Sequence, residues 1–222
     1  MMCFMALNAL ADFEQSICYG QTYDGMIKNA SQMPKKGKNY IVFSSLAWYL
    51  GRTYVHSEAK KVMVATYDQL ATEFPHHVFM YAETGWANGK QFKPHKTHQN
   101  GLSVDFMVPV KNSKAEPSLL PVRASNKWGY DIDFSSTGEF DMFQIDFEIM
   151  AEHLKLLYEI SRKQGFSIKR VYFDPRLQPL LFKTSAGQFI QKHIQFNKQQ
   201  AWVRHDEHYH VDFDIKCEKI TH

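Results

Sequence analysis

The sequence has few cysteines, prolines and glycines, and it has little net charge. Its 222 residues include only 3 cysteines, 8 prolines and 11 glycines, which excludes collagen-like and low-complexity proteins. Lysine and arginine number 26 against 23 acidic residues. This excess is too small for a nucleic-acid-binding protein, in which many more basic residues gather on one face. We therefore expect no nucleic-acid partner. No apolar run approaches the ~20 residues of a membrane-spanning helix, so we do not expect an integral membrane protein either.

Apolar residues are plentiful enough to build a core. They make up 44% of the chain, against 22% charged residues, and such a balance excludes a disordered protein. The length suits one domain, and the chain contains no internal repeat and no linker rich in proline, glycine or serine. We therefore predict a single domain over residues 12–222.

Helical and strand-like segments follow one another without a regular rhythm. Apolar residues recur at helical spacing after an expected cap at Ser57, as far as Pro75, and again from Phe147 to Gly165. The Asp174-Pro175 pair predicts the start of a short helix. Strands are expected over residues 78–83, 103–108, 168–173 and 208–215. This mixture favours an α+β fold with a central antiparallel sheet and flanking helices.

One long segment fits neither pattern. Residues 111–139 are polar and irregular, and a connection of this length inside a compact domain is usually a functional loop or flap.

The first eleven residues resemble part of a secretory signal. They are mostly apolar and end in Ala9-Leu10-Ala11, a small-x-small sequence typical of a cleavage site, but they are short and no basic residue precedes them. We interpret residues 1–11 as a signal remnant; the alternative is a short buried segment.

The cysteines leave two interpretations open. They are Cys3, Cys18 and Cys217. Cleavage after Ala11 would remove Cys3 and leave an even pair that can form a disulfide bond in an oxidising compartment. Two unrelated buried thiols are equally compatible with the sequence.

Histidines are concentrated in two clusters, one of which lies on a predicted strand. Alternate residues of a strand share a face. The polar residues of this strand are His208, His210, Asp212 and Asp214, and the apolar ones are Tyr209, Val211, Phe213 and Ile215. Because the apolar side chains need a core, the two imidazoles are expected to line the opposite face or a cleft. There they can converge on one ion, for which zinc is the commonest partner of neutral imidazole.

The other cluster lies before and within the strand at residues 103–108. By the same alternation, Asp105 faces away from the core, and Gly101 permits a sharp turn that brings His98 over Asp105. His98, Asp105 and one of the two late histidines then form a set of three ligands. Such a set leaves a fourth position for water, as in catalytic zinc sites. The isolated histidines are interpreted as surface or capping residues: His56, His76, His77, His153 and His193.

These motifs carry a family resemblance. His98-x6-Asp105 with His208-x-His210 resembles the signature of the LAS zinc peptidases, which include the hedgehog zinc domain. More closely, the chain is similar to the penicillin-insensitive murein endopeptidases. The resembling stretches are Gly89-Lys-Gln-Phe92, His95-x-x-His98-Gln-x-Gly101-Leu-x-Val-Asp105, Val171-Tyr-Phe-Asp-Pro and His205-x-x-His208-x-His210-Val.

The resemblance implies roles for six residues. His98, Asp105 and His210 would bind Zn²⁺, and His208 would be the catalytic histidine beside it. The resemblance makes His205 and His95 further active-site histidines, which orient water or substrate or stabilise charge.

The resemblance also implies a substrate and a compartment. It implies a LAS/hedgehog-like fold and an enzyme that hydrolyses the peptide cross-links of peptidoglycan, at the bond between D-Ala and meso-diaminopimelate or at a related L,D bond. The enzyme would be periplasmic or secreted, and cell-envelope secretion machinery is a candidate partner. A non-catalytic zinc domain that binds peptidoglycan or protein is the alternative. The sequence does not indicate an oligomeric state.

Overall fold

A central five-stranded sheet organises the protein. The computed structural model describes residues 15–220, so the expected signal remnant at 1–11 and Cys3 lie outside the described residues. The strand order is β12-β13-β7-β6-β4. The strands are β12 (Ser167–Tyr172), β13 (His208–Asp214), β7 (Ser103–Met107), β6 (Phe79–Tyr81) and β4 (Tyr40–Val42).

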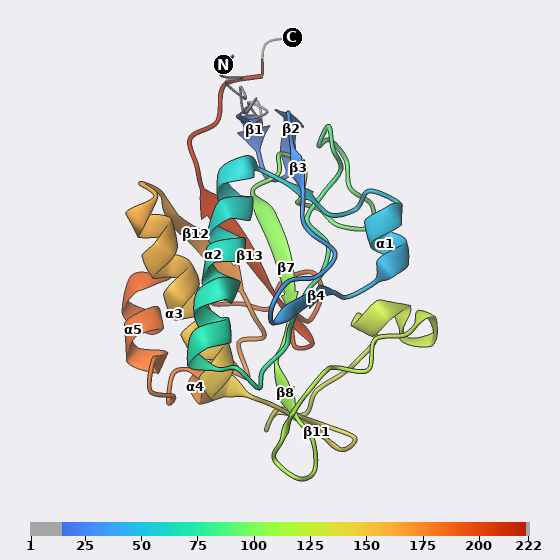
Figure 1. The fold of residues 1–222 in the computed structure, drawn as a ribbon, viewed down its shortest axis with the longest axis vertical. Coiled ribbons are helices and arrows are strands. Elements are labelled where there is room, and N and C mark those ends of the chain that lie inside the picture. The colour runs from blue at the N-terminus through green and yellow to red at the C-terminus, as the bar shows by residue number, and fades with distance from the viewer. Residues whose placement is uncertain (1–14, 221–222) are drawn as a thin grey trace, which may run out of the picture.

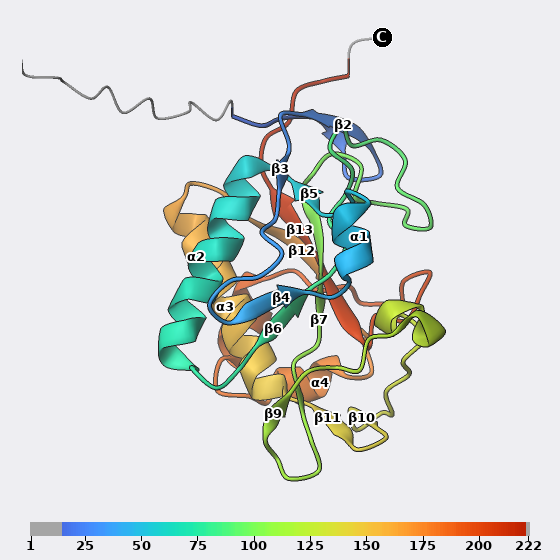
Figure 2. The same cartoon turned by 45° about the vertical axis from the view of Figure 1, so that its right-hand side comes forward.

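Helices cover one face of this sheet, with α2 and α3 packed side by side (Figure 1). The other face is approached by α1 and the irregular segment that follows β8 (Figure 2). The helices are α1 (Ser45–Tyr49), α2 (Ser57–Glu73), α3 (Phe147–Lys163), α4 (Gln178–Leu181), α5 (Gly187–His193) and the 3₁₀ turn η1 (Ala124–Gly129). Within the described residues, none of the helices has both the length and the apolar character needed to cross a bilayer.

Smaller sheets extend the molecule at its two ends (Figure 1). At one end, β1 (Ile17–Gln21) pairs with β2 (Asp24–Lys28), and β3 (Ser31–Gln32) pairs with β5 (Tyr54–Val55). At the other, a four-stranded sheet has the order β10-β11-β8-β9. Its strands are β10 (Glu139–Phe140), β11 (Phe143–Ile145), β8 (Val110–Lys111) and β9 (Pro117–Ser118).

The α+β class predicted from the sequence is confirmed, but the central sheet is mixed. β4 and β6 are parallel, whereas a fully antiparallel sheet was expected. A parallel pair needs a crossover connection, and here the chain passes through α1, β5 and α2 between the two strands.

Two helix starts differ from the expected ones. The cap of α2 is His56, not Ser57, because the His56 Nδ1 accepts a hydrogen bond from the Glu58 N–H at 3.2 Å. Asp174 does not cap a helix. Its carboxylate accepts from the backbone N–H and the guanidinium of Arg176, so the Asp-Pro pair forms a turn and α4 begins only at Gln178.

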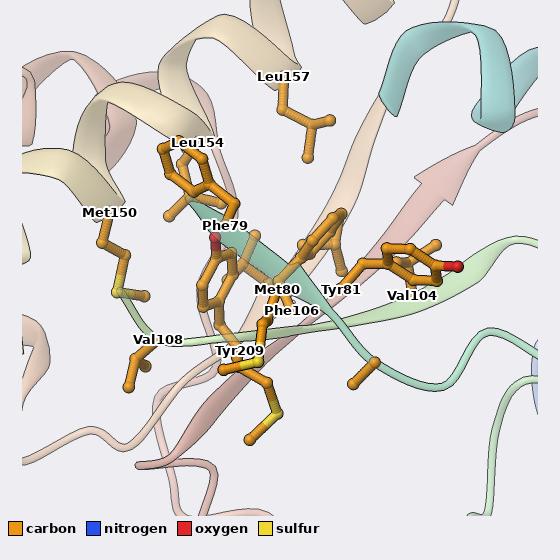
Figure 3. Packing of buried hydrophobic residues seen from close by; sticks show 14 of the residues in the cluster. Phe79, Met80, Tyr81, Val104, Phe106, Val108, Met150, Leu154, Leu157 and Tyr209 are labelled. Carbon is orange, nitrogen blue, oxygen red and sulfur yellow. The ribbon is translucent and has the colours of Figure 1, made fainter. Parts of the chain in front are cut away.

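The predicted alternation along β7 and β13 is confirmed on the core side. Val104 and Phe106 of β7 and Tyr209 of β13 pack against the helices (Figure 3). The polar side of these strands is also buried, so loops must cover it.

His153 contradicts the prediction of a surface or capping residue. It is completely buried and stacks against Tyr67 and Phe79, while its Nδ1 accepts a hydrogen bond from the Tyr209 hydroxyl at 2.8 Å. Its position on the inner side of α3 explains the burial. Desolvation lowers the pKa of His153 to about 3, so its ring is neutral in the folded protein.

Cys18 and Cys217 form a disulfide bond with a sequence separation of 199. It ties β1 to the segment that follows β13, where Tyr19 and Glu218 also form a parallel bridge. The structure therefore agrees with the interpretation of a disulfide-bonded pair and not with that of two unrelated thiols.

The double substitution Cys18→Ser, Cys217→Ser is expected to lower the free energy of unfolding by about 2–5 kcal/mol, because it releases a long closed loop in the unfolded chain. Denaturant unfolding measures this change. A reducing agent should destabilise the wild type to the level of the double variant and leave the variant itself unaffected; no effect on the wild type would contradict the bond.

His153 gives the protein a pH-dependent stability. Its pKa is about 3 when folded and about 6.5 when unfolded. The unfolded chain therefore binds one more proton between these values, and stability falls as the pH drops below about 6.5. The contribution is about 1.4 kcal/mol per pH unit. His153→Gln should make this fall shallower by that amount, whereas the exposed His193→Gln should follow the wild type. If the free energy of unfolding fell equally steeply with pH in His153→Gln and wild type, the lowered pKa of His153 would be disproved.

Candidate metal centre and active site

Asp105 lies at the centre of the polar side of the sheet. It is on β7, between β6 and β13, and its side chain is completely buried. Its backbone N–H donates to the Glu83 carbonyl, its own carbonyl accepts from Ala82, and it pairs in register with His210. Because neighbouring strands hold it on both sides, the position of its carboxylate is fixed.

His98 reaches Asp105 from the loop before β7. The turn depends on Gly101, which has a φ of 75°; a Cβ there would lie 2.5 Å from Ile27 and 3.0 Å from the backbone of His56. The His98 Nδ1 lies 3.3 Å from the Thr84 carbonyl, so it is the nitrogen that donates, and Nε2 lies 3.3 Å from Asp105 Oδ1. The predicted approach of His98 over Asp105 is confirmed.

His210 faces the same carboxylate oxygen from β13. Its Nδ1 lies 2.9 Å from Asp105 Oδ1, and its Nε2 lies 2.9 Å from Asp212 Oδ1. Asp212 in turn accepts a hydrogen bond from the Ser103 hydroxyl at 2.6 Å. Burial opposes a charge on His210, but Asp212 and Asp105 outweigh it and raise the pKa of His210 to about 10.

These residues fit a divalent metal ion. The buried Nε2 of His98 has no hydrogen-bond partner among the described residues, and the ring of His210 lies 4.7 Å from the ring of His98. The second nitrogen of each ring faces an oxygen acceptor, which is how metal-binding histidines are oriented. His95, His98 and Asp105 each offer one potential ligand atom, and these three atoms lie within 4.8 Å of one another. The nitrogen and oxygen donors suit zinc.

His95 lies on the outer side of this group. Its Nε2 forms a 2.5 Å hydrogen bond with Glu83 Oε2, and its Nδ1 lies 3.7 Å from Asp105 Oδ2. Glu83 also accepts from the Arg52 guanidinium. Burial raises the pKa of Glu83, but the hydrogen bonds from His95 and Arg52 outweigh this effect and lower its pKa overall. The side chain of Glu83 is therefore an ionised partner of His95.

His208 lies beside the carboxylate of Asp105. Its Nε2 lies 3.9 Å from Asp105 Oδ1, and its Nδ1 lies 2.7 Å from Glu207 Oε1. Burial lowers the pKa of His208 to about 4, although Asp105 opposes this shift. The ring is therefore neutral near pH 7 and able to accept a proton.

His205 is next to His208, with ring centroids 4.7 Å apart. Its Nδ1 lies 3.0 Å from the Val203 carbonyl, so that nitrogen donates. Burial, together with His208, lowers the pKa of His205 to about 3. A neutral ring in this tautomer has only an acceptor at Nε2, which suits the orientation of water or substrate better than the stabilisation of negative charge.

Two acidic residues between these histidines are also buried. Burial raises the pKa of Glu207 to about 8, and burial with the neighbouring Glu207 raises the pKa of Asp206 to about 7. Near neutral pH this segment is therefore less negatively charged than its sequence suggests.

Tyr130 closes the group from the irregular segment predicted at 111–139. Its hydroxyl lies 3.1 Å from Asp105 Oδ2, and its ring contacts the rings of His95 and His208. Burial and the nearby Asp105 raise the pKa of Tyr130 well above its usual range, so the hydroxyl is a donor.

The group lies in a cleft of about 450 Å³. His205, His208 and His210 line it, as do α1, η1 and the loop at 93–97. The exposed side chains of Leu50 and Trp202 also border the cleft. The cleft therefore connects the buried histidines to exposed side chains at the surface.

All six residues singled out from the sequence are brought together here: His95, His98, Asp105, His205, His208 and His210. Sequence reasoning missed Glu83, Tyr130 and Glu207, and it placed Asp212 on the polar face without a role. Glu83 closes a predicted strand and Tyr130 lies in the predicted functional loop, but neither position by itself indicates what the side chain contacts.

Comparison with known proteins identifies a family for the chain. None of the curated proteins compared gives a significant match. A family model described as penicillin-insensitive murein endopeptidase matches residues 18–221. This range begins at the first cysteine of the disulfide bond and includes every residue of the cleft. The chain therefore belongs to the penicillin-insensitive murein endopeptidase family.

Proposed function

We propose that the protein is a zinc-dependent murein endopeptidase that hydrolyses the peptide cross-links of peptidoglycan. The observation that carries the proposal is the convergence of His98 Nε2 and His210 Nδ1 on one oxygen of Asp105, with the neutral His208 beside them. The bond is D-Ala–meso-diaminopimelate or a related L,D bond, in line with the family and its LAS-type signature.

His98, Asp105 and His210 hold the ion in this proposal. Bound zinc would lower the pKa of a water molecule to about 7 and polarise the carbonyl of the scissile bond. The chain's own contribution is to fix the three ligands. β7 and β13 hold Asp105 and His210 in register, and Thr84 and Asp212 orient the two imidazoles.

His208 acts as the general base and then as the general acid. Its neutral ring takes the proton of the attacking water at Nε2 when its Nδ1–H donates to Glu207, which lies 2.7 Å away. The same Nε2 later delivers the proton to the leaving amine. Such proton transfer by a positioned side chain contributes about 10²–10⁴-fold to a rate.

His95 and His205 have different tasks. His95 Nε2 is hydrogen-bonded to Glu83, and its Nδ1 lies 3.7 Å from Asp105 Oδ2, so the ring is held where it can stabilise negative charge that develops in the cleft. His205 has only Nε2 free, and it orients water or the substrate peptide.

The compartment follows from the same evidence. A disulfide bond between Cys18 and Cys217 suits an oxidising compartment, and peptidoglycan lies outside the cytoplasmic membrane. We therefore propose a periplasmic or secreted enzyme. The small net charge of +3 is compatible with an anionic wall polymer.

Digestion of purified sacculi tests the activity and the bond together. The wild type should release soluble muropeptides whose masses identify the cleaved bond, and a chelator should stop the release until zinc is restored. His208→Ala, treated in the same way, is the inactive control. Binding to sacculi without release by the wild type would instead identify a non-catalytic binding domain.

The two strand histidines should be separable by substitution. His210→Ala removes a ligand and should abolish stoichiometric zinc, measured by elemental analysis of the purified protein. His208→Ala leaves the three ligands in place and should retain zinc while kcat falls about 10²–10⁴-fold. Full activity in either variant, or zinc lost equally from both, would contradict the assigned roles.

A further inference from the structure

Tyr130 is held in the cleft by an unusual turn. Lys127, Trp128 and Gly129 have φ values of 48°, 56° and 98°. Residues other than glycine adopt such left-handed conformations at a cost and persist in them only when their surroundings enforce it. The enforcing contact is Asn126, whose Oδ1 accepts from the backbone N–H groups of Arg123 at 2.8 Å and Gly129 at 2.9 Å.

The chain after Tyr130 is anchored as well. Ile132 and Phe134 are buried in the core. The backbone of Phe134 donates to Asp206 Oδ2 at 2.6 Å and accepts from the Arg204 guanidinium at 2.7 Å. The turn on one side and these contacts on the other fix the Tyr130 hydroxyl relative to the sheet.

The two oxygens of Asp105 have different surroundings. Oδ1 faces ring nitrogens of His210 at 2.9 Å, His98 at 3.3 Å and His208 at 3.9 Å. Oδ2 faces the Tyr130 hydroxyl at 3.1 Å. The His95 Nδ1 is 3.7 Å from Oδ2, which is too long for a hydrogen bond. Among the described side chains, Tyr130 is therefore the hydrogen-bond donor to Oδ2.

We propose that Tyr130 is a positioning residue that makes Asp105 bind the metal ion through one oxygen. The inference rests on the proposed zinc site. By occupying Oδ2, the hydroxyl leaves Oδ1 as the oxygen turned toward the two histidine ligands. A carboxylate with both oxygens free can bind an ion with both, and this would add a fifth ligand that crowds the position a catalytic site keeps for water.

The substitution Tyr130→Phe removes the hydroxyl and keeps the ring. Tyr172→Phe is the matched control, because the Tyr172 ring packs against the proposed ligand His210, with ring centroids 5.4 Å apart, while its hydroxyl lies 3.4 Å from Arg170 and has no contact with Asp105. Asn126→Ala provides a second route to the same effect, since it releases the turn that holds Tyr130. Thermal unfolding of the metal-free proteins verifies that each variant is folded.

Cobalt(II) added to the metal-free proteins reports the coordination directly, because four-coordinate cobalt absorbs visible light several-fold more strongly than five-coordinate cobalt. We expect strong absorption for wild type and Tyr172→Phe. Tyr130→Phe and Asn126→Ala should absorb several-fold more weakly. Competition with a chelator should show about 10–100-fold weaker cobalt binding for Tyr130→Phe, as for other residues that orient metal ligands.

The outcomes separate this inference from the proposed function. A Tyr130→Phe spectrum equal to that of wild type overturns the role of Tyr130 while leaving the metal site intact. An equal loss of absorption in Tyr172→Phe also overturns it, because the effect would then not be specific to Oδ2. Failure of wild type to bind cobalt overturns the metal site and the inference together.

Discussion

The structure depends on a single buried carboxylate. Asp105 lies in the middle of the central sheet with no exposed surface, and a buried charge is tolerated only when it is paired and hydrogen-bonded. Its partners are ring nitrogens and one hydroxyl, supplied by segments that lie up to 105 residues away in the sequence. Burial raises the pKa of Asp105, but the neighbouring rings of His98 and His208 and the hydrogen bond from His210 outweigh it and hold this pKa well below its usual range. The polar side of the sheet is thus arranged around one negative charge that attracts a cation.

The same sheet explains why the site is a cleft. Side chains alternate along β7 and β13, so the residues that build the core beneath α2 and α3 force the polar ones onto the other side. That side is covered by the short helix α1, the loop at 93–97 and the segment around η1, and these short segments leave the cleft between them. A second helical layer there would have buried the histidines from substrate. The irregular segment at 111–139 is therefore part of the site, because it forms one wall of the cleft.

Much of this arrangement can be predicted from the sequence, because it follows from local rules. A period of two placed Asp105 and His210 on the polar side of their strands, and Gly101 indicated the turn that brings His98 over Asp105. Contacts set by distant packing could not be predicted in this way. No local pattern shows that Glu83 binds His95, or that α3 buries His153. The parallel β4–β6 pair was missed for the same reason, since it depends on how the crossover through α2 packs.

The histidines of the site differ in the protein oxygen that faces one of their two ring nitrogens. In each of the five rings, one nitrogen faces an oxygen atom of the protein, and in four of them the other nitrogen is turned toward Asp105. His98 and His205 face backbone carbonyls, those of Thr84 and Val203. The other three face carboxyl groups: His95 faces Glu83, His208 faces Glu207 and His210 faces Asp212. A backbone carbonyl only fixes the tautomer, whereas an ionised carboxylate such as Asp212 also favours positive charge on the ring and raises the pKa of His210. In the proposed function, the atom behind each ring is what allows residues of one type to bind an ion, transfer a proton or stabilise charge within a single cleft.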